Sequence, residues 1–537
     1  MPLSIPKSVK SLAVDISLQN FPRRVLSSVF ASVPAQPMAE PMRLLAISPS
    51  ALKLIQMEEK FADQLSGQTS PGWAHCYWGS QFGSYAGQLG DGAAMLIGES
   101  GGYEINLKGS GPTPFSRGFD GRKVQRSSVR EFIGSEAMAG LGIPTTRAAT
   151  IFVSDKTKVP RDVNYSGRMV PEPCAVISRI AKTFFRFGSF ESYDKDDSPM
   201  IKSLTEYCLA NFVSKEVQNN SETLLEFVID KTAYLIACWQ SVGFTHGVMN
   251  TDNMSIIGDT IDYGPFGFVE TYDPHFVPNT SDKFGRYAFS EQPRMAAWNC
   301  QKLANVLALH YDSEPMDVRN MFFEKYNLYY ENKMMEKIGT NENFAILHSE
   351  LFALMEKSAV DFTSVFRYLS ELHTNNVSDI AKSIMETYPS VDRIKKLSAT
   401  RISATDLPEI ELFAQTRLNE LEQAGIDLHT IARWKFHLER IESFTNGNER
   451  REECLNEWKK FLIKLAPLIS DESRIVMKSV NPIYIPRQSL IQKGIDGEID
   501  LNVLVEIFEN PFEKRSYEDF EKPDLTNSND VCLSCSS

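Results

Sequence analysis

The chain has 537 residues, of which 42% are apolar and 23% charged, a composition typical of a globular protein with a sizeable core. Its net charge of −13 excludes the overall positive field that draws proteins to nucleic acid, so we expect no nucleic-acid partner. The longest apolar stretches, Tyr234 to Trp239 and Leu501 to Phe508, are far shorter than the roughly 20 residues that cross a bilayer, so we expect no membrane partner.

Residues 1–40 are predicted to be an N-terminal extension with a targeting role. They combine several serines with only two acidic residues and four basic ones, which are Lys7, Lys10, Arg23 and Arg24. This composition is typical of a mitochondrial presequence. A merely frayed N-terminus is the alternative for this segment, and the cytoplasm is the alternative location.

Residues 41–175 are predicted to form a small lobe of strands with one helix. Glycine is dense from Ala74 to Gly121, and the alternating apolar run from Tyr103 to Lys108 predicts a strand. Apolar residues at near-helical spacing predict a helix from Ser127 to Gly142.

Lys108 at the end of this strand and Glu131 in this helix are candidates for a nucleotide site. A kinase-like site needs a strand lysine that is held by a glutamate of the following helix. The alternatives are a solvated lysine and a capping box of Ser128 and Glu131 that only satisfies the helix start.

Two glycine-rich loops are further candidates. Gly90 and Gly92 would let backbone N–H groups approach a phosphate. A second loop carries Asp120 and Gly121 and would border the same pocket. A plain surface loop is the alternative in both cases.

Arg179 and Arg186 are seven residues apart, so on a helix they would share one face. Two neighbouring guanidinium groups repel unless they share an anion, and a polyphosphate is the candidate. Two surface arginines paired with acidic neighbours are the alternative.

The segment from 243 to 264 carries the sharpest chemical pattern. If residues 258–259 form a two-residue hairpin turn, Asn253 and Asp262 lie together at its open end. An amide oxygen and a carboxylate suit Mg²⁺, and Asp252 is left to point elsewhere. Protein kinases have this order, in which a catalytic-loop Asp and Asn precede the metal-binding Asp of D-F-G. The alternative is that these side chains only cap a turn and end a strand.

Residues 176–517 are predicted to form a larger, mostly helical lobe. Helices are expected at 224–240, 291–311, 344–357, 378–386, 407–424 and 428–444. Residues 518–537 are polar and acidic and predict a flexible tail. Cys532 and Cys535 form a C-x-x-C pair there, which favours redox chemistry with a partner over metal binding, with a reduced tail as the alternative.

Together these stretches resemble the selenoprotein O family of kinase-like proteins. The similar segments are Tyr77 to Gly83, Gln88 to Gly92, Leu107 to Gly111, Arg130 to Phe132, Gly142 to Arg147, Gly243 to Phe268, Gly285 to Tyr287, Asn481-Pro482 and the terminal C-x-x-C. The resemblance implies an α+β, bilobal protein-kinase-like fold with a small β-containing N-lobe and a larger, mostly helical C-lobe. Because eukaryotic members are typically mitochondrial and bacterial ones cytoplasmic, it favours a mitochondrial location.

The same resemblance implies a protein adenylyltransferase. Its members bind ATP in a flipped orientation and transfer AMP to Ser, Thr or Tyr hydroxyls of proteins, with pyrophosphate leaving. By this resemblance Asp252 accepts the proton, and Asn253 and Asp262 bind Mg²⁺, with Mn²⁺ as an alternative. The residues implied around the nucleotide are Gly90, Gly92, Lys108, Asp120, Gly121, Glu131, Arg179, Arg186 and Asp262.

Two positions depart from the family pattern: many members carry an arginine where this chain has Ala93, and some animal members carry selenocysteine where this chain has Cys535. An ordinary protein kinase is the first alternative, but its G-x-G-x-x-G, H-R-D and A-P-E segments do not appear as such. The second is a catalytically inactive ATP-binding scaffold, against which the intact Lys108, Asp252 and Asp262 argue.

Overall fold

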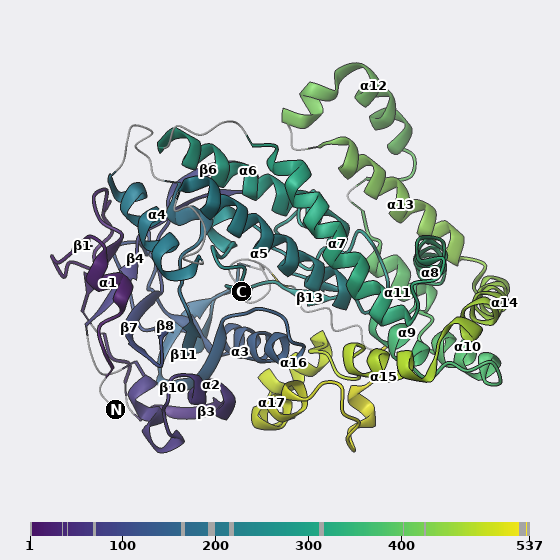
Figure 1. Ribbon diagram of the computed structural model, residues 1–537, viewed down its shortest axis with the longest axis horizontal. Helices are drawn as coiled ribbons and strands as arrows, with labels where there is room; N and C mark the ends of the chain where they lie inside the picture. The colour runs from purple at the N-terminus through teal and green to yellow at the C-terminus, as the bar shows by residue number, and fades with distance from the viewer. Residues whose placement is uncertain are drawn as a thin grey trace.

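The computed structural model describes residues 3–34, 36–39, 41–67, 71–162, 167–191, 199–213, 220–310, 316–400, 402–423, 426–525 and 533. A sheet-rich part and a helical part lie side by side, and the helices α12 and α13 extend from the helical part (Figure 1). This arrangement confirms the predicted α+β class. Among the described residues, none of the helices is both long and apolar enough to span a bilayer.

The main sheet of the described chain has nine strands. Their order is β1 (Val14–Asp15), β2 (Phe30–Val33), β4 (Gly72–His75), β7 (Ala94–Ser100), β8 (Tyr103–Lys108), β11 (Val170–Ala181), β10 (Arg147–Arg161) and β3 (Arg43–Ile47), with β9 (Lys123–Val124) paired to β11. The predicted strand from Tyr103 to Lys108 is confirmed as β8. It is antiparallel to both of its neighbours and buried on both faces, which accounts for its apolar middle.

Part of the segment predicted as an N-terminal extension is built into this sheet. All four residues of β2 are buried, and they pair with β4 in an antiparallel ladder. Two smaller pairs lie outside the main sheet: β5 (Trp78–Gln81) with β6 (Ser84–Gln88), and β12 (Phe244–Thr245) with β13 (Gly267–Phe268).

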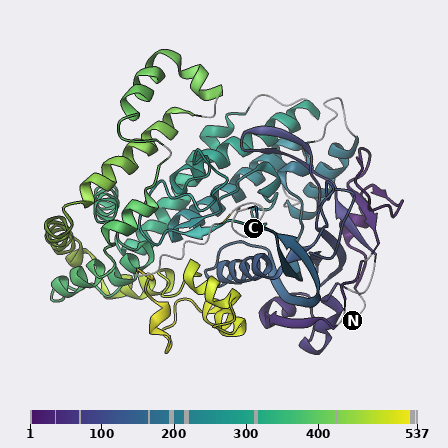
Figure 2. The same ribbon diagram turned by 180° about the vertical axis from the view of Figure 1, so that it is seen from behind.

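The helix α3 (Gln125–Gly140) lies between the sheet and the C-terminal helices α16 and α17 (Figures 1 and 2). The prediction of a helix here is confirmed, with its start two residues earlier. Because α3 is covered on both sides, its residues from Ser128 to Met138 are all buried. The capping-box alternative is wrong, since the N-cap is Val124 and no side chain caps the helix.

The helical part contains the predicted helices, with ends that differ by a few residues. In the described chain, α1 (Lys7–Ser11) and α2 (Pro49–Leu54) lie beside the sheet (Figure 1). The other described α-helices are α4 (Pro199–Phe212), α5 (Ser221–Val242), α6 (Gln292–His310), α7 (Val318–Ile338), α8 (Phe344–Ser358), α9 (Phe362–Leu369), α10 (Val377–Met385), α11 (Val391–Leu397), α12 (Leu407–Gln423), α13 (Leu428–Phe444), α14 (Gly447–Leu465), α15 (Asp471–Val480), α16 (Gln488–Ile495) and α17 (Leu501–Glu509).

The helix α5 leads directly to the chemical segment. Asn220 caps its start by accepting a hydrogen bond from the backbone of Thr223, and Gly243 ends it with a φ of 72°. That left-handed glycine turns the chain into β12 and then into the loop that carries Asp252. The apolar core is continuous from the sheet through α3 to α5, α6 and α7.

Candidate active site

Asp262 is the centre of a cluster of three cations. Its carboxylate accepts hydrogen bonds from Lys108 Nζ at 2.9 Å, Arg179 Nη1 at 2.6 Å and Arg186 Nη1 at 2.7 Å. Burial would raise the pKa of this carboxyl, but the charges of Lys108, Arg186 and Arg179 hold it well below its usual range. The carboxylate is therefore ionised and shared by all three cations.

The strands β8 and β11 set the positions of two of these cations. Lys108 lies opposite Ile177, and Arg179 lies opposite Asn106, so both cations come from the same region of one antiparallel ladder. Glu131 Oε2 lies 2.8 Å from Lys108 Nζ, and Glu131 Oε1 lies 3.3 Å from Arg179 Nη1. The predicted pairing of Lys108 with Glu131 is thus present.

The expectation of a helix that carries both arginines is wrong. Arg179 lies in β11, whereas Arg186 lies in the irregular segment just before a short 3-10 helix, Phe187–Ser189. They meet because the chain turns between them, which brings Arg186 to Asp262. Arg186 is 1% exposed, also donates to the carbonyl of Asp252 at 2.8 Å, and stacks 4.3 Å from the Tyr77 ring centroid.

The two-residue hairpin that was predicted to bring Asn253 and Asp262 together is also wrong. Ser255 pairs with Arg186, and Thr260 pairs with Thr145, so the two arms bond to other segments. Asp252 and Asp262 meet instead through Arg186, which donates to both. Asp262 has a φ of 55°, a left-handed conformation that few residues other than glycine adopt and that is concentrated at functional sites.

Asp252 lies in a short 3-10 helix, Thr251–Asn253, with one carboxylate oxygen available. Oδ2 accepts a hydrogen bond from Gln81 Nε2 at 3.1 Å, while Oδ1 is buried without a hydrogen-bond partner in the described chain. Burial raises the pKa of Asp252 to about 6, although the bond from Gln81 opposes this rise. A Cβ at Gly79 would lie 2.8 Å from Oδ1, so glycine there leaves space for this oxygen.

Asn253 follows Asp252 in the same short 3-10 helix. Its Nδ2 donates to the carbonyl of Val248 at 2.9 Å, which turns the amide oxygen away from that contact. No group of three or more His, Cys, Asp or Glu residues in the described chain has the arrangement of a metal site. An amide oxygen and one carboxylate nevertheless fit Mg²⁺, which usually takes few protein ligands together with substrate phosphates.

The glycine-rich segment packs tightly against the loop that contains Phe115. A Cβ at Gly90 would lie 2.2 Å from the Phe115 ring, and one at Gly92 would lie 2.9 Å from the Phe115 carbonyl oxygen. Close packing alone therefore requires glycine at both positions. Ala93 lies next to the cluster, because its carbonyl accepts a hydrogen bond from the N–H of Gly109, which follows Lys108.

The hydrogen bonds of Asp120 and the close contacts of Gly121 lie outside the Asp262 cluster. Asp120 forms a two-point ion pair with Arg161 at 2.8 and 2.9 Å, and no hydrogen bond or ion pair in the described chain joins it to Lys108. Gly121 has a φ of 63° and packs against Pro112. Lys123 is a further cation near Lys108. Its burial and the charge of Lys108 lower its pKa to about 8.

Sequence reasoning missed several residues of the site. Tyr77, Asp91 and Asn106 contact the arginines of the cluster, Gln81 contacts Asp252, and Lys123 is close enough for the charge of Lys108 to lower its pKa. Most lie next to or inside the glycine-rich segments already singled out, but their side-chain directions depend on strand register and tertiary packing. Cys532 and Cys535 lie outside the described residues.

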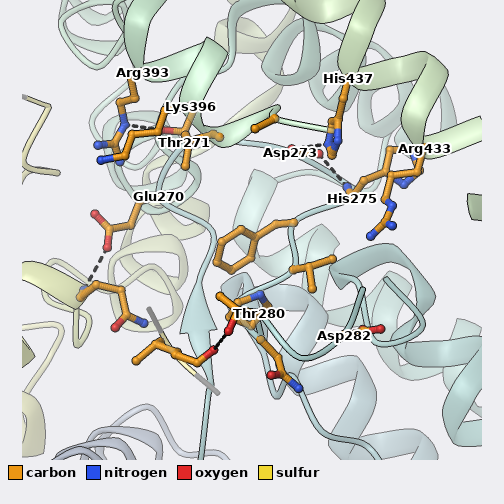
Figure 3. A pocket seen from close by; sticks show the side chains of 18 of the residues that line it. Glu270, Thr271, Asp273, His275, Thr280, Asp282, Arg393, Lys396, Arg433 and His437 are labelled. Atoms are coloured by element: carbon orange, nitrogen blue, oxygen red, sulfur yellow. Dashed lines mark hydrogen bonds and ion pairs between the residues drawn. The ribbon is translucent and has the colours of Figure 1, made fainter. Parts of the chain in front are cut away.

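A separate cavity of about 500 Å³ lies between the chain that follows β13 and the helices α11 and α13 (Figure 3). None of the candidate nucleotide or metal residues lines it. Leu533 is one of its lining residues, and its carbonyl accepts hydrogen bonds from the backbone and side chain of Thr280. Leu533 is the one described residue beyond 525, and it lies at this cavity.

Comparison with known proteins gives one consistent result. A family model described as "Protein adenylyltransferase SelO" matches residues 22–510. Mouse "Protein adenylyltransferase SelO, mitochondrial" is 36% identical over 89% of this chain and 80% of its own length. Zebrafish "Protein adenylyltransferase SelO-1, mitochondrial" is 33% identical over 94% and 84%, respectively. "Protein nucleotidyltransferase YdiU" of Aromatoleum aromaticum is 34% identical over 96% of this chain and 95% of its own length.

Proposed function

Because the chain belongs to the SelO family of protein adenylyltransferases, we propose that its Asp262 cluster is where AMP passes from ATP to Ser, Thr or Tyr hydroxyls of other proteins. The main support is that two carboxylates with different surroundings, Asp252 and Asp262, lie close together, since Arg186 donates a hydrogen bond to each of these residues. Asp262 is neutralised by three cations, whereas Asp252 has a buried oxygen with no hydrogen-bond partner in the described chain.

Lys108, Arg179 and Arg186 bind the phosphates of ATP in this proposal. All three already converge on one carboxylate, and a polyphosphate offers the same cations more negative charge. Gly90, Gly92, Asp120 and Gly121 line the pocket around the nucleotide. Glu131 keeps Lys108 and Arg179 oriented, since it contacts both.

Asn253 and Asp262 would hold Mg²⁺, with Mn²⁺ as the alternative. The bound metal would neutralise charge on the phosphates. Support for this assignment comes from the types of donor atom and from the bond between Asn253 and Val248, which orients the amide.

Asp252 accepts the proton of the attacking hydroxyl. The hydroxyl oxygen forms a bond to the α-phosphorus, the bond between the α-phosphorus and the bridging oxygen of the β-phosphate breaks, and pyrophosphate leaves with that electron pair. The proton passes to Oδ1 of Asp252, while Gln81 holds Oδ2. A pKa of about 6 leaves Asp252 largely ionised at neutral pH, as a general base must be.

The wider architecture of the proposal is a bilobal, protein-kinase-like one. The small lobe covers about residues 41–175 together with β1, β2 and the end of β11, the helical lobe the rest up to 517, and the tail 518–537. Support comes from the segregation of the sheet and the helices (Figure 1). We also propose a mitochondrial location, since the mouse and zebrafish relatives carry that word in their names, whereas the bacterial relative does not.

The test compares ATP labelled at the α-phosphate with ATP labelled at the γ-phosphate, each incubated with Mg²⁺, the protein and a mitochondrial extract. Stable protein labelling from the α-label alone is expected. Labelling from the γ-label alone would make the chain a kinase, and labelling from neither would favour a scaffold. Asp252→Asn should lose transfer but keep ATP binding, whereas loss of both would contradict its role as the base.

A further inference from the structure

Lys123 is a cation near the Asp262 cluster, and the AMP transfer proposed above assigns no role to it. It is the first residue of β9, which pairs with β11 so that Lys123 lies opposite Ala175. Ile177, two residues further along β11, lies opposite Lys108. Residues opposite each other in an antiparallel pair share a face of the sheet, as do residues two apart along a strand. Lys123 and Lys108 therefore project from the same face.

The register also places Lys123 at one end of a row of cations. Arg179 lies further along β11 on the same face, so the order along this strand is Lys123, Lys108, Arg179. A strand advances about 3.3 Å per residue, which separates the positions of Lys123 and Lys108 by about 7 Å. Arg186 continues the row at its other end, because it shares the carboxylate of Asp262 with Arg179.

The charge of Lys123 has no counter-ion among the described residues. No hydrogen bond or ion pair joins it to them, and Glu131 and Asp262 act on it only through their charge. Both of these acids already pair with Lys108. Partial burial and the charge of Lys108 lower the pKa of Lys123 to about 8, so it is still mostly cationic at neutral pH.

The nearest acid in the sequence does not compensate this charge either. Asp120 accepts two hydrogen bonds from Arg161, at 2.8 and 2.9 Å, and a third from the backbone N–H of Arg122. Its carboxylate is therefore already matched by Arg161, whose own charge opposes that of Lys123. An added anion would be attracted to Lys123 more than to a lysine that already has a partner.

The surroundings of Lys123 leave access for such an anion. Lys123 is only half-buried, and the side chains of Lys108 and Asp262 are 14% and 19% exposed. Gly109 has a φ of 101°, and a Cβ there would lie 3.1 Å from Cβ of Lys123, so glycine leaves space beside the lysine. Ala93, whose carbonyl accepts the N–H of Gly109, brings no charge to this place. An anion bound to Lys108 therefore finds Lys123 as the next cation along the row.

We propose that Lys123 binds the β- or γ-phosphate of ATP, the part of the nucleotide that leaves as pyrophosphate. The proposal rests on the proposed AMP transfer and adds a fourth cation to its three phosphate-binding residues. Its direction follows from the row of cations. Arg186 donates to the carbonyl of Asp252, beside which the α-phosphorus lies during transfer. The remaining phosphates then extend away from Asp252, along the row toward Lys123.

The test measures the binding of two nucleotides that differ in these phosphates. Titration calorimetry with Mg²⁺ uses α,β-methylene-ATP, which cannot release pyrophosphate, and AMP is measured by competition against it. Lys123→Met keeps an apolar stem but removes the charge. It should bind the ATP analogue about tenfold more weakly than the wild type and AMP less than about twofold more weakly, and the retained binding of AMP shows that the site is folded. Lys123→Arg keeps the charge and should stay within about threefold of the wild type for both nucleotides.

Lys333→Met is the matched control. Lys333 is also half-buried and has no carboxylate partner in the part of the chain that the structure describes, but it lies on α7 above the Tyr234 ring. This variant should bind both nucleotides as the wild type does.

Three results would overturn the assignment of Lys123 even if AMP transfer is observed. They are unchanged binding of the ATP analogue to Lys123→Met, equal weakening of the analogue and AMP, and binding to Lys123→Arg as weak as to Lys123→Met. Selective weakening of the analogue by Lys123→Met, in a protein whose wild type transfers no AMP, would instead refute the proposed function and leave Lys123 as a phosphate-binding residue.

Discussion

The substitution Asp262→Asn separates the two tasks that we assign to this carboxylate. Without nucleotide, Asp262 forms ion pairs with Lys108, Arg179 and Arg186. It would therefore compete with the phosphates of ATP for these three cations. In the proposed complex it holds Mg²⁺. Asparagine keeps the shape and one acceptor oxygen but removes the negative charge, so ATP binding without metal should strengthen while metal-dependent transfer is lost.

The size of the effect follows from the three contacts, which are 2.6 to 2.9 Å long. A hydrogen bond to a charged group contributes about 1.5–3 kcal/mol. If loss of the Asp262 charge makes the binding of the phosphates to the three cations about 2 kcal/mol more favourable, the affinity for ATP in the presence of a chelator rises about thirtyfold. Calorimetric titration with ATP, with and without Mg²⁺, measures this change, and α-labelled ATP measures transfer.

Asp230→Asn is the matched control for this experiment. Asp230 also accepts hydrogen bonds from a lysine and a second residue, Lys325 and Tyr329, but it lies on α5 outside the cluster. It should change neither ATP affinity nor transfer. Weaker binding of ATP to Asp262→Asn in the chelator, or transfer near the wild-type rate, would refute the reasoning.

Two further predictions concern pH and stability. A proton acceptor must be ionised, so kcat/KM should fall as the pH drops through about 6, the pKa of Asp252. The hydrogen bond from Gln81 lowers this pKa, so Gln81→Leu should move the fall in kcat/KM to higher pH. A fall near pH 4, or one that Gln81→Leu leaves in place, would contradict the assignment. Arg487→Met should lower the free energy of unfolding in urea by about 3–5 kcal/mol, because Arg487 makes two 2.9 Å bonds to the fully buried Asp361. Arg515→Met, which removes a more exposed ion pair, should cost less than about 1 kcal/mol, and an equal loss in both variants would count against this reasoning.

The sequence predicted elements well where local pattern and final environment agree. The strand β8 and the helices α3, α5, α8 and α13 were predicted because their apolar spacing continues over most of their length. The helix α7 was not predicted. Its surface is rich in tyrosine and asparagine, and it is held by packing against α5 and α6.

The sequence identified the main candidates of the site more reliably than their geometry. Lys108 pairs with Glu131 as predicted, and Asp262 also joins Lys108, a contact that was not predicted. A helix for Arg179 and Arg186 was wrong because their spacing of seven also fits a strand followed by a turn. The hairpin failed for a similar reason. Its two arms find backbone partners at Arg186 and Thr145, which are distant in sequence and which no local pattern reveals.

The charge balance of the cluster explains why nucleotide and metal binding should be coupled. Lys108, Arg179 and Arg186 are matched by the carboxylates of Asp262 and Glu131, with Asp91 3.9 Å from Arg186. A triphosphate that takes these cations leaves Asp262 buried without its partners, which is costly for an ionised carboxylate. A divalent cation beside Asp262 removes that cost and also neutralises the phosphates. The ion pairs of Asp262 with the three cations therefore stabilise the cluster when no ligand is bound. Because the triphosphate replaces Asp262 at the cations and the metal then pairs with Asp262, binding of either ligand should increase the affinity for the other.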